Sequence, residues 1–296
     1  MKRTFPPCIA VLGPTASGKT AYAIHLAKRL NGAIISADSR QVYAEMNIGT
    51  AKPREAYAQH THNSATPDMI DGVPHYLLNI ASIDHAYALS DWLADAHAAL
   101  AVIAKNKQLP IIAGGTMLYI DALLDGYDIP DIAPNPELRK ELEQQSPEIL
   151  YKKLQELDPA SCKFIESHNT RRIIRALEVM NATGEKFSTL RSASASQYAA
   201  TRIGIFPGWD AMKSNVETRS RDMLAQGLAA EAAALRTNYP TSPLLQTINY
   251  KQALELADGQ LTEEQAVASM SQATLRYAHR QMSWWNRRKD IGWICA

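Results

Sequence analysis

An eight-residue segment, Gly13-Pro14-Thr15-Ala16-Ser17-Gly18-Lys19-Thr20, follows directly on the apolar run Cys8–Leu12. It matches the phosphate-loop pattern G-x-x-x-x-G-K-[ST], which connects a buried strand to a helix. The glycines let successive N–H groups face anionic oxygens, and the helix that follows adds its positive N-terminal end. Lys19 supplies a full charge, and the Thr20 hydroxyl is placed to hold Mg²⁺. The segment therefore predicts an α/β core that binds a diphosphate or triphosphate, without indicating which group the phosphates carry.

The first 125 residues alternate short apolar runs with amphipathic helical segments, as in βαβ units. Strands are predicted over residues 8–12, 33–36, 75–79, 110–113 and 202–207, and helices over 19–30, 90–105 and from 210 to the end. After Gly126, prolines and charged helical sequence indicate an inserted helical domain. We predict a doubly wound parallel sheet of P-loop type, with a core domain of residues 1–125 and 200–296 and a helical insertion over 126–199. A Ser/Ala stretch at 192–200 is typical of an exposed linker.

Composition excludes some classes of protein. Lys and Arg total 31 against 30 acidic residues, so any nucleic-acid surface must come from local clusters of charge. The three cysteines lie far apart, which predicts a reduced protein without a disulfide framework or a cysteine zinc site. No run approaches the roughly 20 apolar residues of a membrane span. We expect a cytoplasmic protein that does not bind membranes.

Two further motifs are more specific than the phosphate loop. Asp38-Ser39-Arg40-Gln41-Val42-Tyr43 ends the second predicted strand, and Met46-Asn47-Ile48-Gly49-Thr50-Ala51-Lys52-Pro53 follows closely. Together with the loop they closely resemble the bacterial tRNA dimethylallyltransferases. Additional matches, in family order, are Pro74–Leu77, Gly114–Tyr119, Arg171–Glu178, Met223–Glu231 and Arg280–Trp284. One departure is Asn249, where relatives usually have Gly; Asn is the next-best residue for a left-handed backbone.

The resemblance implies a reaction. It is the transfer of a dimethylallyl group from dimethylallyl diphosphate to N6 of the adenosine beside the anticodon (position 37), with release of diphosphate and Mg²⁺ as cofactor. The implied catalytic residues are Asp38 as general base, Thr15, and Arg219 on the diphosphate. Asp38 also fits the Mg²⁺-holding aspartate of an NTPase. Arg221 competes with Arg219, but side chains two positions apart on a helix diverge by about 200°, so only one can face the site.

Basic and polar side chains form the predicted RNA surface. The resemblance implies that the anticodon stem-loop of tRNA is the partner and that the helical insertion contacts it. Arg276, Arg280 and Arg287 would share one helix face with nearby aromatic rings, whereas Trp285 is predicted in the core. Gln41 could read a base edge or serve as a turn glutamine. The predicted tRNA-binding residues are Asp38, Ser39, Arg40, Gln41, Thr116, Arg139, Arg171, Arg172, Arg175, Asn249, Tyr250, Lys251, Arg280, Gln281 and Trp284.

Two other functions fit the same fold. A small-molecule kinase would use the loop and Mg²⁺ for ATP, with the helical insertion acting as a lid. An NTP-dependent RNA-binding protein would hydrolyse nucleotide when RNA binds. Both alternatives predict ATP turnover, whereas prenyl transfer predicts none. We expect the protein to act as a monomer.

Overall fold

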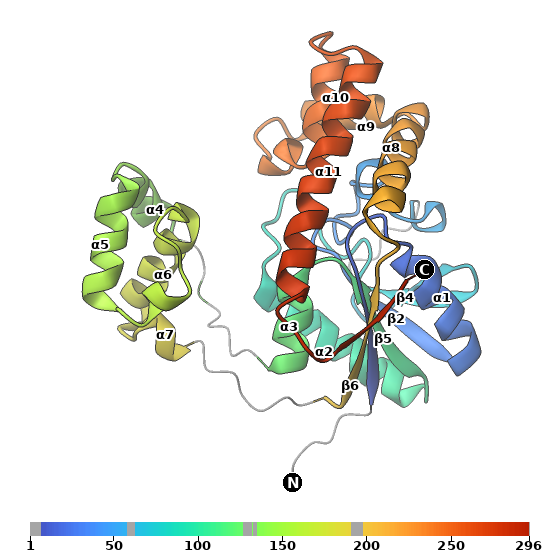
Figure 1. Cartoon of the computed structure of the whole chain (residues 1–296), viewed down its shortest axis with the longest axis horizontal. Coiled ribbons are helices and arrows are strands. Elements are labelled where there is room, and N and C mark those ends of the chain that lie inside the picture. Colours follow the sequence, from blue (N-terminus) through green and yellow to red (C-terminus); the bar gives the residue numbers. More distant parts are fainter. Residues whose placement is uncertain (1–6, 58–62, 127–131, 133–134, 191–197, 296) are drawn as a thin grey trace. The chain divides into compact units, whose positions relative to one another are not determined.

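The central element of the fold is a mainly parallel β-sheet (Figure 1). The computed structural model describes residues 7–57, 63–126, 132, 135–190 and 198–295. Within them, seven strands are ordered β3-β4-β2-β5-β1-β6-β7, and only β3 runs antiparallel to its neighbour. The strands are β1 Cys8–Leu12, β2 Gly32–Ala37, β3 Asp68–Ile70, β4 Val73–Tyr76, β5 Leu109–Gly114, β6 Ala200–Ile205 and β7 Ile291–Ile294.

Helices surround this sheet and extend beyond it. The core carries α1 Lys19–Leu30, α2 Leu89–Lys105, α3 Met117–Asp125, α8 Trp209–Ala225, α9 Leu228–Asn238, α10 Tyr250–Ala257 and α11 Glu263–Trp285. Its short 3₁₀ helices are η1 Ile48–Thr50, η2 Arg54–Ala56 and η4 Pro243–Gln246. The long helix α11 packs along α8 (Figure 1). Both helices belong to the C-terminal part of the chain. Their side chains can therefore contact loops that lie near its N-terminus.

Both faces of the sheet are covered, which explains why its central strands are continuous apolar runs. On one face, Val11 and Ile34 pack with Ala23 of α1. On the other face, Leu12 and Ile35 join the larger core that contains Trp92 of α2. Side chains of successive strand residues thus pack on opposite faces of the sheet, as the two-residue period of a strand requires.

The register of the central strands places three loops together. Leu12 of β1 pairs with Gly114 of β5, and Gly114 in turn pairs with Ala37 of β2. A side chain at Gly114 would collide with the Ala37 backbone, so the close approach of β2 and β5 requires glycine there. The phosphate loop, the segment that begins at Asp38 and the turn at Gly115 therefore leave the sheet at one edge, where open α/β sheets bind ligands.

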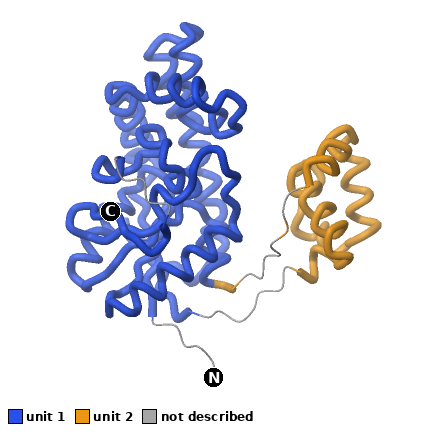
Figure 2. Tube along the Cα trace, turned by 180° about the vertical axis from the view of Figure 1, so that it is seen from behind, with its two compact units in different colours: residues 1–124, 198–296 blue, residues 125–197 orange. Residues whose placement is uncertain are grey.

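The chain divides into two compact units, which Figure 2 shows in different colours. One comprises residues 1–124 and 198–296, and the other comprises residues 125–197, against the 126–199 predicted for the insertion from the sequence. The second unit has its own apolar core, in which Leu150, Ile165 and Ile173 are buried. Its helices are α4 Pro136–Glu143, α5 Pro147–Leu157, η3 Ser161–Lys163, α6 Thr170–Thr183 and α7 Phe187–Leu190. Most of the predicted Ser/Ala linker lies outside the described residues.

Several elements differ from the sequence prediction, among them α3, which was not predicted, and β6, which begins and ends two residues earlier than expected. The strand predicted at 75–79 ends at Tyr76, because Leu77 and Asn79 have positive φ angles that a strand cannot accommodate. Strands β3 and β7 were not predicted, and β7 replaces the end of an expected helix. Helix α11 ends at Trp285, so the helical spacing argued for Arg287 does not apply. Among the described helices, none combines the length and the apolar character needed to cross a lipid bilayer.

Candidate active site

A pocket of about 200 Å³ lies at the edge of the sheet where β1, β2 and β5 end. It brings together most of the phosphate loop with Asp38, Gln41 and Arg219, which are far apart in the sequence. Its lining residues are Thr15, Ala16, Gly18, Lys19, Thr20, Ala21, Asp38, Gln41, Thr50, Ala51, Ala113, Gly114 and Arg219. The catalytic residues predicted from the sequence, Thr15, Asp38 and Arg219, therefore share one cavity.

The phosphate loop has the curled backbone that its glycines predict. Gly13 and Gly18 have φ angles of 152° and 85°, and Ala16 adopts a φ of 66° without being glycine. A Cβ atom at Gly13 would come within 2.5 Å of the carbonyl oxygen of Ile205, so the residue must be glycine for packing as well. The Lys19 Nζ donates to the Pro14 carbonyl at 3.3 Å. The lysine side chain thus folds back onto the first residues of the loop.

Asp38 follows the last residue of β2 and has one oxygen engaged in the turn. Its Oδ1 accepts the backbone N–H of Arg40 at 2.9 Å and of Gln41 at 3.3 Å. The Thr116 hydroxyl accepts the N–H of Ser39, which holds this turn against the loop after β5. In the described part of the chain, no residue donates a hydrogen bond to the second oxygen, Oδ2. One oxygen therefore fixes the carboxylate while the other can accept a proton from a ligand.

Arg219 of α8 faces the pocket, and Arg221 does not. The Arg219 Nη2 donates to the Thr15 hydroxyl at 2.7 Å. Arg221 is exposed and pairs with Glu217 at 3.1 Å, one helical turn away. This placement agrees with the helical geometry that favoured Arg219.

Burial sets the protonation of the two cations in the pocket. It lowers the pKa of Lys19 to about 8, an effect that Asp38 opposes and Arg219 reinforces. It also lowers the pKa of Arg219 to about 10, again against the effect of Asp38. Two half-buried cations beside a single carboxylate leave the pocket with an excess of positive charge. An anion such as a diphosphate would balance it.

We expect diphosphate binding to weaken as the pH rises above about 8. The unliganded protein loses the Lys19 charge there, so the dissociation constant for a diphosphate ligand should rise, by at most about tenfold per pH unit. Below pH 8 the lysine is charged and this dependence disappears. Titration calorimetry between about pH 7.5 and 9.5 measures the effect. In a Lys19→Arg variant the guanidinium stays charged, so the same rise in that variant would exclude Lys19 as its source.

Two residues that hold the phosphate loop were missed or given another role. Gln281 of α11 is fully buried; its Oε1 accepts the N–H of Thr15 at 2.9 Å and its Nε2 donates to Gly115 O at 2.7 Å. Asn215 of α8 donates to Ala16 O at 3.2 Å. Asn215 lies four residues before Arg219, so the same helical spacing could have identified it. Gln281 was predicted to bind tRNA, but its polar atoms are used within the protein.

The other predicted RNA-binding residues of the core fall into two groups. Tyr250 and Asn249 are buried, and the Trp284 indole donates to Asp121 at 2.6 Å. Asn249 has a φ of 76°, so the positive φ predicted from the sequence for this position is confirmed. Arg40, Lys251 and Arg280 are exposed, and Ser39 and Thr116 are half-buried. Trp285 is fully buried, as predicted.

In the insertion, two predicted RNA-binding arginines are bound to a buried carboxylate. Arg139 and Arg175 both reach Glu178, at 2.9 and 2.6 Å, and the Glu178 side chain is only 1% exposed. Arg171 is exposed and Arg172 is half-buried, with its guanidinium over the Phe164 ring. Arg139 thus joins α4 to α6, whereas Arg175 pairs with Glu178 within α6 and also donates to the Ile132 carbonyl at 3.0 Å. Arg171 is therefore the more accessible cation of the predicted cluster.

Replacing Glu178 with Gln should lower the free energy of unfolding of the insertion by about 2 kcal/mol, because two half-exposed arginines lose their charged partner. Burial alone would raise the pKa of Glu178, but hydrogen bonds from Arg139, Arg175 and the Asn135 backbone together lower it. This stabilisation is present above the unfolded pKa, near 4.5, and is lost as the pH falls through the lower folded value. Hydrogen exchange of α6 amides measures the change; the exposed Glu185→Gln is the control.

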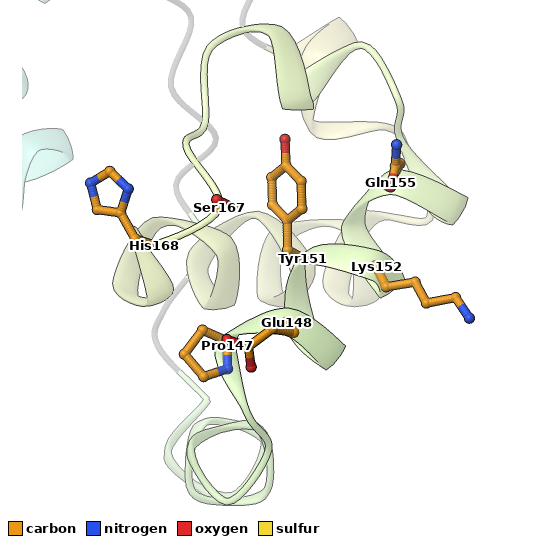
Figure 3. A pocket seen from close by; sticks show the side chains of 7 residues that line it. All are labelled: Pro147, Glu148, Tyr151, Lys152, Gln155, Ser167 and His168. Atoms are coloured by element: carbon orange, nitrogen blue, oxygen red, sulfur yellow. The ribbon is translucent and has the colours of Figure 1, made fainter.

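A second hollow, of about 400 Å³, lies on α5 and the segment before α6 (Figure 3). In Figure 3 the Lys152 side chain points away from the Tyr151 ring, and His168 lies at the opposite side. The lining residues are Pro147, Glu148, Tyr151, Lys152, Gln155, Ser167 and His168. The predicted RNA-binding arginines of the insertion are not among them, so this hollow is separate from that cluster.

Comparisons with known proteins identify the family. The IPP transferase family model matches residues 41–289, and the Isopentenyl transferase model matches residues 7–64. A tRNA dimethylallyltransferase of Roseiflexus sp. (strain RS-1) is 38% identical, over 96% of this chain and 92% of its own length. One from Bacillus mycoides (strain KBAB4) is 34% identical, over 96% of this chain and 88% of its own length.

Solved structures agree with this assignment. The tRNA isopentenylpyrophosphate transferase of Bacillus halodurans is 33% identical and superposes with a TM-score of 0.68, covering 97% of this chain and 89% of that one. A eukaryotic dimethylallyltransferase acting on tRNA has a TM-score of 0.79 at 23% identity, covering 97% of this chain and 73% of that one, which shows a shared fold. With a family model spanning most of the chain and relatives aligned over nearly all of it, the chain belongs to the IPP transferase family.

Proposed function

We propose that the protein transfers a dimethylallyl group from dimethylallyl diphosphate to N6 of the adenosine beside the anticodon of tRNA, and releases diphosphate. The observation that carries the proposal is the pocket in which a carboxylate with one unengaged oxygen, Asp38, lies with Lys19, Arg219 and the phosphate loop. The names of the relatives supply the transferred group, dimethylallyl, and the acceptor molecule, tRNA.

Stabilising the negative charge on the departing diphosphate is the main electrostatic requirement of this reaction. As the allylic C–O bond lengthens, positive charge spreads over the alkene and negative charge accumulates on the leaving group. Donors aimed at that developing charge in a partly enclosed site stabilise the transition state. Lys19, Arg219 and the N–H groups of the phosphate loop are such donors, and the Arg219 contact with Thr15 fixes the direction of its guanidinium.

The acceptor amine needs a base, because its lone pair is delocalised into the adenine ring. N6 attacks the allylic carbon as the C–O bond breaks, and its proton passes to Asp38 Oδ2. The two backbone hydrogen bonds at Oδ1 hold the carboxylate in place without using the oxygen that receives the proton. The adenine must leave the base stack to reach this pocket, so the nucleotide is flipped out of the anticodon loop.

The residues of the pocket also fit Mg²⁺. Thr20 lines the cavity beside Lys19, as the hydroxyl of a phosphate loop does when it holds this ion. No group of three or more His, Cys, Asp or Glu side chains with metal-site geometry occurs in the described ranges, so most ligands would come from the diphosphate and water. When bound, Mg²⁺ supplies positive charge to the leaving diphosphate.

Each unit carries exposed cations that could contact RNA. Arg40, Lys251 and Arg280 of the core and Arg171 of the insertion are exposed cations suited to phosphates of the anticodon stem-loop. Since the net charge is only +1, these local contacts would dominate binding, which should weaken steeply with salt. We further propose that the enzyme acts as a cytoplasmic monomer.

The decisive test incubates the protein with Mg²⁺, radiolabelled dimethylallyl diphosphate and bulk bacterial tRNA. Label retained in the tRNA, with adenosine N6 identified as the attachment site by mass spectrometry, is the expected result. Parallel reactions contain ATP with and without tRNA. Hydrolysis of ATP without prenyl transfer would favour a kinase or an NTP-dependent RNA-binding protein and overturn the proposal.

A further inference from the structure

Glu231 of α9 binds the start of the short helix η1 from outside the pocket. Its carboxylate accepts backbone N–H groups from three consecutive residues, Asn47 at 3.3 Å, Ile48 at 3.0 Å and Gly49 at 3.3 Å. The Tyr250 hydroxyl donates to the same carboxylate at 2.7 Å. Consecutive N–H groups at the start of a helical turn favour a negative charge, and here the protein supplies it.

The same turn is held by two further residues of the C-terminal helices. The Asn249 Nδ2 donates to the Gly49 carbonyl at 2.8 Å. The Tyr250 ring occupies the space into which a Cβ at Gly49 would project, so the ring and the turn are in close contact. On the other side, the Lys52 Nζ donates to Asn47 Oδ1 at 3.0 Å. These contacts leave η1 little freedom to shift relative to α9 and α10.

The far end of η1 forms part of the pocket wall. The carbonyl oxygens of Thr50 and Ala51 accept the Gln41 Nε2 at 3.1 and 3.3 Å, and all three residues line the cavity. The backbone N–H of Gln41 donates in turn to Asp38 Oδ1. A continuous series of hydrogen bonds therefore runs from Glu231 through η1 and Gln41 to the carboxylate proposed as the base.

We propose that Glu231 is a positioning residue for the acceptor side of the active site, acting through η1 on Gln41 and the Asp38 turn. The inference rests on the proposed prenyl transfer. The phosphate loop is held by other contacts, from Gln281 and Asn215. Loss of the Glu231 charge should therefore impair use of the acceptor RNA and leave diphosphate binding nearly unchanged.

The first experiment compares Glu231→Gln and Tyr250→Phe with the wild type in steady-state transfer to an anticodon stem-loop. Gln keeps the length of the side chain, but its NH₂ group would face backbone donors. We expect kcat/KM for the RNA to fall about tenfold for Glu231→Gln and about threefold for Tyr250→Phe. The dissociation constant for dimethylallyl diphosphate should stay within about twofold. The control is Arg236→Gln, on the same helix but in an exposed pair with Asp258, and it should behave as wild type.

A double-mutant cycle with Gln41→Ala separates positioning from a merely structural role. If Glu231 acts through Gln41, Glu231→Gln in the Gln41→Ala background should cost less than about threefold. A full tenfold loss in that background, an equal loss of diphosphate affinity, or unchanged kinetics would overturn the inference. Wild-type protein that transfers no prenyl group would overturn the proposed function, and this inference with it. Tyr250→Phe removes only a hydroxyl and keeps the test available if Glu231→Gln does not fold.

Discussion

Replacing Asp38 with Asn is expected to slow prenyl transfer by about three orders of magnitude, within the range typical of a lost general base. Asn keeps the Oδ1 that accepts the N–H groups of Arg40 and Gln41, so the turn is preserved. Its amide nitrogen, in the position of Oδ2, cannot take a proton from N6. Single-turnover transfer of radiolabel to tRNA measures the chemical step directly.

The same variant separates the two roles that the sequence left open for Asp38. A base contributes little to binding, so the affinities for tRNA and for the diphosphate with Mg²⁺ should be retained. If Asp38 instead holds Mg²⁺, the Mg²⁺-dependent part of diphosphate binding will weaken together with the rate. Asp71→Asn is the matched control, because Asp71 forms an exposed pair with Lys28. Near-normal turnover of the Asp38 variant would refute the proposed role.

Replacing Arg219 with Met is expected to lower the transfer rate by about a hundredfold to a thousandfold, as for removal of one transition-state donor. Met retains much of the apolar volume but removes the guanidinium that contacts Thr15 in the pocket. Because the developing negative charge lies on the leaving group, the loss should appear in the chemical step and in diphosphate affinity, with tRNA binding unchanged. Single-turnover kinetics and calorimetry with the diphosphate separate these quantities.

Arg221→Met provides a closely matched control on the same helix. Arg221 is exposed and pairs with Glu217, so its loss should change the rate by less than about twofold. Equal defects in both variants would mean that α8 itself, and not the guanidinium at 219, is responsible.

Much of the fold could be predicted because its signals are local. The strand at 8–12 and the helix at 19–30 are confirmed, since an apolar run, a glycine loop and a helical pattern suffice to specify them. The edge strand β7 was missed because four residues carry little pattern of their own. Its strand conformation depends on pairing with β6. Four α-helices, α8 to α11, separate β6 from β7 in the chain, so no local pattern predicts this pairing.

The site was harder to predict, because a polar or aromatic side chain does not reveal whether it faces a ligand or the protein. Gln281 and Tyr250 fit a predicted RNA surface, but the structure buries both and uses their polar atoms to hold the phosphate loop and Glu231. Nothing in the sequence around Glu231 indicated a role for it, apart from its place at the end of the matching segment Met223–Glu231. The three backbone N–H groups that donate to it lie more than 180 residues earlier in the chain.

The sequence by itself determined the phosphate loop, because backbone conformation within eight residues depends on glycines at set positions. It also determined the order of the core strands and helices that flank the loop. Only the tertiary structure decided which side chains meet there. The shared register of Leu12, Gly114 and Ala37 brings Asp38 beside the loop. The packing of α8 and α11 adds Arg219 and Gln281 from about 200 or more residues away, because side-chain partners at that separation depend on the packing of whole elements.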